Sequence, residues 1–195
     1  MEVKDTNTRA YADYLINHQK SFRAKVFQIP YRAHLKWLGL GRTLDVGCGA
    51  GRNLRALAPG SLGLDHNPIL TEACKGFGLQ AMTTHEWNAQ KEQFSSGFDS
   101  ILFSHVAEHM TSSEFEALLQ GFLFALRPQG RVVVICPQEA GYASDNTHVE
   151  FMDESKISGV LKRLGLQLQA AYSFPLPRAF GRHFRQNETV VVGLT

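Results

Sequence analysis

The sequence predicts an α/β fold built on a mostly parallel sheet with helices on both faces. Three observations support this prediction. After residue 41, short apolar segments alternate with longer amphipathic ones, which is typical of strands joined by right-handed helical crossovers. The first of these strands runs directly into a glycine-rich turn, LDVGCGAGRNL at residues 44–54. The last two strands have only a loop between them, so we expect them to pair antiparallel at one edge of the sheet.

Residues 1–40 precede the alternating pattern and are predicted to be helical. Apolar and aromatic residues recur there at helical spacing: Tyr11, Tyr14, Leu15, Phe22, Val26 and Phe27. Pro30 is expected to interrupt this helix, because a proline removes a backbone hydrogen bond and clashes with the preceding turn. A second short helix should then end near Gly39 or Gly41.

The strands after residue 41 are short, rich in β-branched and apolar residues, and bounded by glycine, proline or polar turns. The seven predicted strands are residues 42–47, 59–66, 79–87, 98–105, 131–137, 166–174 and 188–195. The helices between them are longer and carry apolar residues three or four positions apart. The predicted helices are residues 51–58, 67–78, 110–130 and 151–165.

Two of these helices have a recognisable first turn. Asn67 followed by Pro68 predicts an N-cap with proline at the first helical position, where its missing N–H costs nothing. Thr111 and Glu114 match the Thr-x-x-Glu pattern of a capping box, so we expect the helix there to begin at about Ser112.

Composition limits the class of protein. The chain has 195 residues, of which 44% are hydrophobic and 19% charged, as in a folded domain with a substantial core. Its net charge of +2 is too small to indicate nucleic-acid binding. Cys48, Cys74 and Cys136 are scattered, so neither a disulfide framework nor a cysteine-built zinc site is expected. We expect no signal peptide and no membrane insertion, and we predict a cytoplasmic protein.

The glycine-rich turn and two aspartates indicate a ligand. Gly47, Gly49 and Gly51 permit a tight turn and let a ligand sit against bare backbone, although a tight turn without a ligand is the alternative. Asp45 ends a buried strand, where a carboxylate needs a partner such as an ammonium group. Asp65 ends the second strand, at about the distance at which acidic residues of nucleotide-binding units contact ribose hydroxyls. Together they predict a ligand with a ribose and a positive charge.

With these features the sequence resembles class I S-adenosylmethionine-dependent methyltransferases of the small-molecule type. The segments LDVGCGAG, GLDHNP, FDSILFSHVAEHM, LRPQGRVVVICP and THVEFMD–LKRLG follow the order of that family, from about Leu38 to the C-terminus. The resemblance implies a Rossmann-like doubly wound sheet of seven strands in the order 3-2-1-4-5-7-6, with strand 7 antiparallel. It also implies a single methyltransferase domain over residues 1–195, with residues 1–40 as a helical cap over the pocket for cofactor and substrate.

The resemblance implies S-adenosylmethionine as the cofactor. It places Asp45 and Gly47 at the methionine end of the cofactor and Asp65 at the ribose. The predicted cofactor-binding residues are Asp45, Gly47, Cys48, Gly49, Gly51, Asp65, His66, Trp87, Asn88, Ser104 and His105.

One segment departs from the family pattern. The family usually has an aspartate near the adenine after the third strand, whereas this chain has HEWN at residues 85–88. Glu86 or Asn88 is the candidate acceptor for the adenine amine, and Trp87 is the candidate to lie against the adenine ring.

Residues 105–109 read HVAEH, which matches the H-x-x-E-H pattern of one class of zinc peptidases. A zinc site of that kind needs His105 and His109 on one face of a helix, together with a third ligand. The capping box at Thr111 places HVAEH before the helix, and no third ligand is evident. We therefore predict no metal. In the family this connection borders the transferred methyl group.

Glu108, His109 and His148 are the predicted catalytic residues. Glu108 and His109 are expected to face the substrate, and His148 follows the fifth strand at another edge of the same pocket. A histidine titrates near neutrality and can take a proton from a hydroxyl or amine during methylation. The alternative roles are local support of a turn and of the next helix. Methyl transfer from a sulfonium to a well-positioned nucleophile requires no such residue.

The loop at residues 174–188 carries Arg178, Arg182, His183 and Arg185 among prolines and aromatic residues. If it opens toward the substrate, it predicts a small-molecule methyl acceptor with an anionic group such as phosphate or carboxylate. The alternative is a solvated basic loop. The sequence does not define the oligomeric state.

Two other classes of protein remain open. A nicotinamide-dependent oxidoreductase is disfavoured by Asp45, by the spacing G-C-G-A-G and by the last strand. A non-catalytic methyltransferase-like protein is the second alternative.

Overall fold

The computed structural model describes residues 8–9, 12–13 and 22–195. The chain divides into two compact units, residues 1–94 and 95–195. Seven strands form the sheet in the order β3-β2-β1-β4-β5-β7-β6, which confirms the predicted order. The single domain over residues 1–195 and the cap formed by residues 1–40 stay predictions. Within the described residues, no helix is long and apolar enough to span a membrane.

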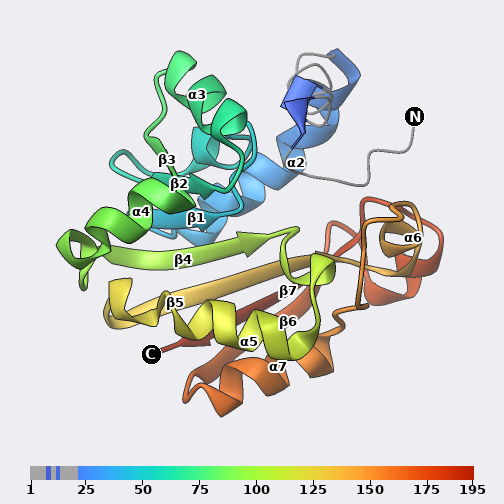
Figure 1. Ribbon diagram of the computed structural model, residues 1–195. Helices are drawn as coiled ribbons and strands as arrows, with labels where there is room; N and C mark the ends of the chain where they lie inside the picture. The colour runs from blue at the N-terminus through green and yellow to red at the C-terminus, as the bar shows by residue number, and fades with distance from the viewer. Residues whose placement is uncertain (1–7, 10–11, 14–21) are drawn as a thin grey trace. The chain divides into compact units, whose positions relative to one another are not determined.

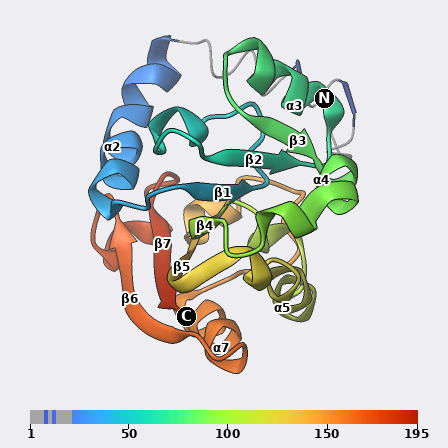
Figure 2. The same ribbon diagram turned by 90° about the vertical axis from the view of Figure 1, so that its left-hand side faces the viewer.

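The first unit contains three parallel strands, which lie side by side in Figure 2. They are β1 (Thr43–Val46), β2 (Leu62–Asp65) and β3 (Ala81–Thr83). β2 pairs in parallel with both of the others. Every residue of β1 and β2 is buried, as expected of parallel strands.

In the described part of this unit, three helices accompany the strands: α2 (Phe22–Leu38), α3 (Pro68–Gly76) and α4 (Thr84–Gln90). α3 confirms its predicted start, because the Asn67 side chain accepts a hydrogen bond from the Ile69 N–H and Pro68 is the first helical residue. α2 corrects the prediction of a break at Pro30, which lies inside the helix. The missing proline N–H removes one bond of the helical ladder without ending the helix.

Two more predictions in this unit were wrong. The expected helix at residues 51–58 is a series of turns with only the short 3-10 helix η1 (Leu54–Ala56), so the glycine turn does not open an α-helix. The expected strand at residues 79–87 ends at Thr83. Thr83 and Glu86 form a capping box, and the helix α4 that it starts takes up the second half of the segment. A second 3-10 helix, η2 (Lys91–Phe94), closes the unit.

The second unit contains β4 (Phe98–Ser104), β5 (Leu126–Pro137), β6 (Gln167–Phe174) and β7 (Glu188–Leu194). β4 and β5 are parallel, while β7 pairs antiparallel with both β5 and β6. The predicted antiparallel edge is therefore confirmed. α5 (Ser112–Gln120) and α7 (Glu154–Arg163) pack against each other beside these strands (Figure 1).

α5 begins at Ser112 behind the Thr111–Glu114 capping box, as predicted, but it ends at Gln120 instead of continuing toward residue 130. Gly121 follows, and after the 3-10 helix η4 (Leu123–Ala125) the strand β5 already begins at Leu126. Leu126 pairs with Phe98, and an irregularity follows before Arg131 pairs with Ser100. The exposed residues between these two pairs conceal the start of the strand in the sequence.

The remaining short elements lie in the connections of this unit. They are η3 (Ala107–His109), α6 (Glu139–Tyr142) and η5 (Arg178–Arg182). All three come from segments that carry predicted site residues or border them.

Candidate functional site

The glycine turn folds back onto the end of β2. The Gly47 and Cys48 N–H groups donate to the Leu64 carbonyl at 2.8 and 2.9 Å. Gly47, Gly49 and Gly51 have φ values of +75°, +55° and +79°, which disfavour residues with a side chain. At Gly51 an added Cβ would also lie 2.6 Å from Leu79 Cδ1, so the turn packs closely against its surroundings there.

Asp65 ties this turn to the next helix. Its Oδ2 accepts the Gly49 N–H at 2.9 Å and its Oδ1 accepts the Asn67 N–H at 2.9 Å. His66 Nδ1 lies 3.6 Å from Oδ1. Each carboxylate oxygen of Asp65 has a further lone pair, so it can still accept a hydroxyl.

Asp45, at the carboxyl side of β1, is fully buried. Neither of its carboxylate oxygens has a hydrogen-bond partner within bonding geometry among the described residues, although the Asn53 side chain lies nearby. Burial raises the pKa of Asp45 to about 7, and the negative Asp65 acts in the same direction, while Arg52 and Asn53 oppose it. An unpaired buried carboxylate is costly, and a cationic or hydrogen-bonding ligand would remove that cost.

Other predicted cofactor residues of this unit have structural partners. The Cys48 side chain packs into a cluster with Leu54, Cys74 and Ala81, and its backbone N–H and carbonyl bond to Leu64 and Gly51. Trp87 is buried and stacks on Phe94 with ring centroids 5.1 Å apart.

The predicted adenine acceptors differ in their surroundings. The Glu86 carboxylate accepts the Thr83 N–H at 2.6 Å and the Thr83 hydroxyl at 2.9 Å. These bonds lower the pKa of Glu86 and commit it to capping α4. Asn88 is exposed on the same helix. Between these two residues, the geometry leaves Asn88 available for a ligand.

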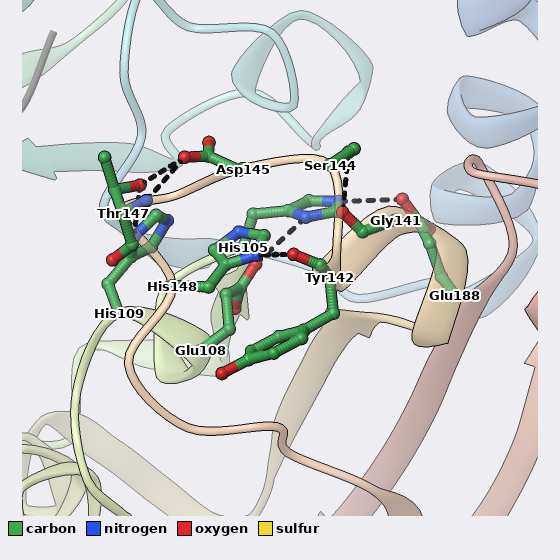
Figure 3. Close-up of polar contacts among 10 residues, drawn as sticks. All are labelled: His105, Glu108, His109, Gly141, Tyr142, Ser144, Asp145, Thr147, His148 and Glu188. Atoms are coloured by element: carbon green, nitrogen blue, oxygen red, sulfur yellow. Dashed lines mark hydrogen bonds and ion pairs between the residues drawn. The ribbon is translucent and has the colours of Figure 1, made fainter. Parts of the chain in front are cut away.

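In the second unit, β4 ends at the buried Ser104 and the chain turns at His105, which has a left-handed φ of +59°. This conformation places the His105 ring between two carboxylates (Figure 3). Its Nδ1 lies 3.1 Å from Oε1 of Glu108, and its Nε2 lies 2.8 Å from Oε1 of Glu188. Burial alone lowers the pKa of His105, but the bonds to Glu108 and Glu188 raise it to about 9. The ring is therefore a cation at neutral pH.

Glu188 is a site residue that the sequence interpretation missed. It begins β7, 83 residues from His105, and its register opposite Pro137 brings it to the end of β5. The signal in the sequence that could have indicated Glu188 is a charged residue at the first position of a mostly apolar strand.

Glu108, His109 and His148, the predicted catalytic residues, lie close together. The rings of His109 and His148 lie 4.9 Å apart, and His148 stacks on Tyr142 at 5.0 Å. His148 Nδ1 lies 2.7 Å from the Tyr142 carbonyl, and His109 Nδ1 lies 3.3 Å from the Thr147 carbonyl. Burial lowers the pKa of His109, and the nearby Glu108 carboxylate opposes this effect.

The basic loop is anchored by a buried amide pair. The Asn187 side chain donates to Gln138 Oε1 at 2.8 Å and accepts the Leu176 N–H at 2.9 Å. Arg178 forms a two-bond ion pair with Glu139 of α6, at 2.7 and 2.5 Å. Of the basic residues predicted to meet an anion, Arg178, Arg182 and Arg185 are all exposed, and Arg178 is already paired.

The sequence of the chain decides its family. Residues 22–171 match the family model described as a methyltransferase domain. The chain belongs to this family. The match confirms the identification as a class I methyltransferase with S-adenosylmethionine as methyl donor. No curated protein matches the chain in sequence.

Solved structures of methyltransferases share the fold at low sequence identity. A S-adenosylmethionine-dependent methyltransferase from Archaeoglobus fulgidus is 17% identical, with a TM-score of 0.71 over 93% of this chain and 99% of the other. A TehB-like methyltransferase from Corynebacterium glutamicum is 22% identical, with a TM-score of 0.66 over 95% and 98%. The magnesium protoporphyrin IX methyltransferase of Synechocystis with bound S-adenosylmethionine is 14% identical, with a TM-score of 0.65 over 97% and 92%.

The residues of the first unit fit the methyl donor. Asp45 offers an unpaired carboxylate to a cationic group, the glycine turn offers backbone without side chains, and Asp65 has free lone pairs for hydroxyls. When bound, the cofactor supplies an electrophilic methyl group on a sulfonium. The task of the protein is to bind the cofactor and to orient this methyl group.

Proposed function

We propose that the protein transfers a methyl group from S-adenosylmethionine to a small-molecule acceptor, with Asp45, the Gly47–Gly51 turn and Asp65 holding the donor. The observation that carries the donor assignment is the unpaired, fully buried Asp45 carboxylate next to a turn of left-handed glycines. His66, which lies beside Asp65, and the exposed Asn88 stay candidates for the nucleoside end. Ser104 and His105 stay candidates from the end of β4.

A small-molecule acceptor is supported by the names of proteins with the same fold. They include the magnesium protoporphyrin IX enzyme and a Burkholderia thailandensis methyltransferase with bound 1,6-didemethyltoxoflavin. The exposed Arg182 and Arg185 support an acceptor with an anionic group. Arg178 supports the loop instead, through Glu139.

The experiment that tests the donor site is calorimetry of the full chain with S-adenosylhomocysteine, S-adenosylmethionine and NAD. We expect binding of the first two only. Asp65→Ala should weaken S-adenosylhomocysteine binding by roughly 1–3 kcal/mol, since a hydrogen bond to a charged group is lost. Glu72→Gln on α3 is the matched control, because Glu72 is exposed and pairs only locally with Lys75.

Turnover on a panel of metabolites, followed by transfer of a labelled methyl group, then identifies the acceptor. A folded Asp65→Ala variant with unchanged affinity contradicts the ribose assignment. Binding of NAD in place of the sulfonium compounds contradicts the proposed function as a whole.

A further inference from the structure

Glu108, His109 and His148 form a group that the binding of the methyl donor does not require. One ligand atom of each side chain lies within 4.8 Å of those of the other two. Figure 3 shows the three side chains approaching one another from the segment after β4 and from the loop before α7. Their types, two imidazoles and a carboxylate, are those found in sites for zinc and related metal ions.

Both imidazoles are oriented by backbone carbonyls. His148 Nδ1 lies 2.7 Å from the Tyr142 carbonyl, and His109 Nδ1 lies 3.3 Å from the Thr147 carbonyl. A carbonyl only accepts, so each Nδ1 carries the proton and each Nε2 keeps its lone pair. Histidines that bind metals are held in the same way, with the second ring nitrogen donating to a carbonyl or carboxylate.

The two oxygens of the Glu108 carboxylate have different surroundings. Its Oε1 is bound to His105, while Oε2 is buried and has no hydrogen-bond partner among the described residues. The buried thiol of Cys136 lies beside this carboxylate. A buried carboxylate oxygen without a partner costs free energy, and a cation beside it would reverse that cost.

We propose that Glu108, His109 and His148 bind one divalent transition-metal ion of the zinc type, with its other coordination positions open. Metal–ligand bonds of about 2.0–2.2 Å place two ligand atoms at most about 4.4 Å apart, so small rotations of these side chains complete the site. His105 is the positioning residue of Glu108.

This site differs from the zinc-peptidase interpretation of HVAEH. That interpretation needs His105 and His109 as ligands, whereas His105 uses both ring nitrogens on Glu108 and Glu188. The third ligand that the sequence did not reveal is His148, from a loop 39 residues beyond His109. The proposal replaces the sequence-based prediction of no metal, and it does not depend on the proposed function.

The test uses the full chain after treatment with a chelator, titrated with Co²⁺ and then with Zn²⁺. We expect one equivalent of Co²⁺ to bind with visible absorption bands and Zn²⁺ to displace it. His109→Ala, His148→Ala and Glu108→Gln should each weaken metal binding by more than about 100-fold, because outer-shell partners alone change it by about 10–100-fold. His85→Ala on α4, an exposed histidine, is the control and should leave binding unchanged.

Three outcomes overturn the proposal. One is the absence of stoichiometric Co²⁺ and Zn²⁺ binding by the wild-type chain. Another is equal binding by His148→Ala and His85→Ala. The third is a thiolate-to-cobalt charge-transfer band, which would place the ion on cysteines. Since His148 is only half-buried, His148→Ala decides the question even if the buried Glu108→Gln variant fails to fold.

Discussion

Burial raises the pKa of Asp45 from 3.8 to about 7, so ionising this carboxylate costs more in the folded chain than in the unfolded one. Because the folded-state pKa is the higher of the two, the folded state holds the proton more tightly. The free energy of unfolding therefore falls as the pH rises from about 4 through about 7. A cation bound beside Asp45 removes this cost, so the residue that destabilises the free protein should strengthen the binding of a cationic ligand.

Asp45→Asn is therefore expected to stabilise the free protein and to weaken its binding of the cationic ligand. At pH 8, without ligand, its free energy of unfolding should exceed that of the wild type by roughly 1–4 kcal/mol, because no buried charge has to form. At pH 5 the difference should shrink. Urea unfolding at the two pH values measures both, and calorimetry should show weaker binding of S-adenosylmethionine.

An Asp45→Asn variant that is less stable than the wild type by the same amount at both pH values would contradict this account. It would mean that the carboxyl group has a structural partner in its neutral form.

At the scale of the element, a helix-capping pattern predicted the start of one helix, but the same pattern went unrecognised at the start of another. Thr111-x-x-Glu114 predicted the start of α5 because an apolar helical face follows it. Thr83-x-x-Glu86 has the same pattern, yet the segment from residue 79 to 87 was interpreted as one strand. Its short, mixed composition fits both structures, and only the pairing of β3 with β2 fixes where the strand ends.

We expect Thr83→Ala to destabilise the first unit by about 1 kcal/mol, because the Thr83 hydroxyl accepts the Glu86 N–H at 3.1 Å at the start of α4. Thr84→Ala changes the adjacent exposed threonine and should alter the free energy of unfolding by less than about 0.5 kcal/mol. Thermal or urea unfolding of both variants makes the comparison. Equal losses in the two would show that the capping box contributes little here.

At the scale of the whole molecule, the order of the seven strands followed from the resemblance to a family, and the antiparallel edge followed from the sequence itself. The set of site residues was predicted less completely. Glycines and aspartates near strand ends have local signals, whereas the Glu188–His105 contact depends on the register of β7 against β5. A contact across 83 residues leaves no periodic pattern in the sequence. The pairing of Arg178 with Glu139 was missed for the same reason.

The basic loop gives the last prediction, because its arginines divide into two kinds. Arg178, Arg182 and Arg185 are all exposed, but Arg178 is held by Glu139 beside the anchor formed by Gln138 and Asn187. If Arg182 and Arg185 attract an anionic acceptor, Arg182→Gln with Arg185→Gln should raise the acceptor KM several-fold, and the effect should weaken with added salt.

Affinity for S-adenosylhomocysteine should not change in this double variant, since neither arginine is among the residues proposed to hold the donor. Arg178→Gln is the matched comparison. It should lower thermal stability by loosening the loop, and any change in its KM should be explained by that loss of stability.

The measurements are initial rates with the acceptor identified on the metabolite panel, at low and high salt, together with calorimetry of S-adenosylhomocysteine binding. A normal KM in the double variant would leave these arginines as a solvated surface, and a parallel loss of S-adenosylhomocysteine binding would assign them to the donor instead.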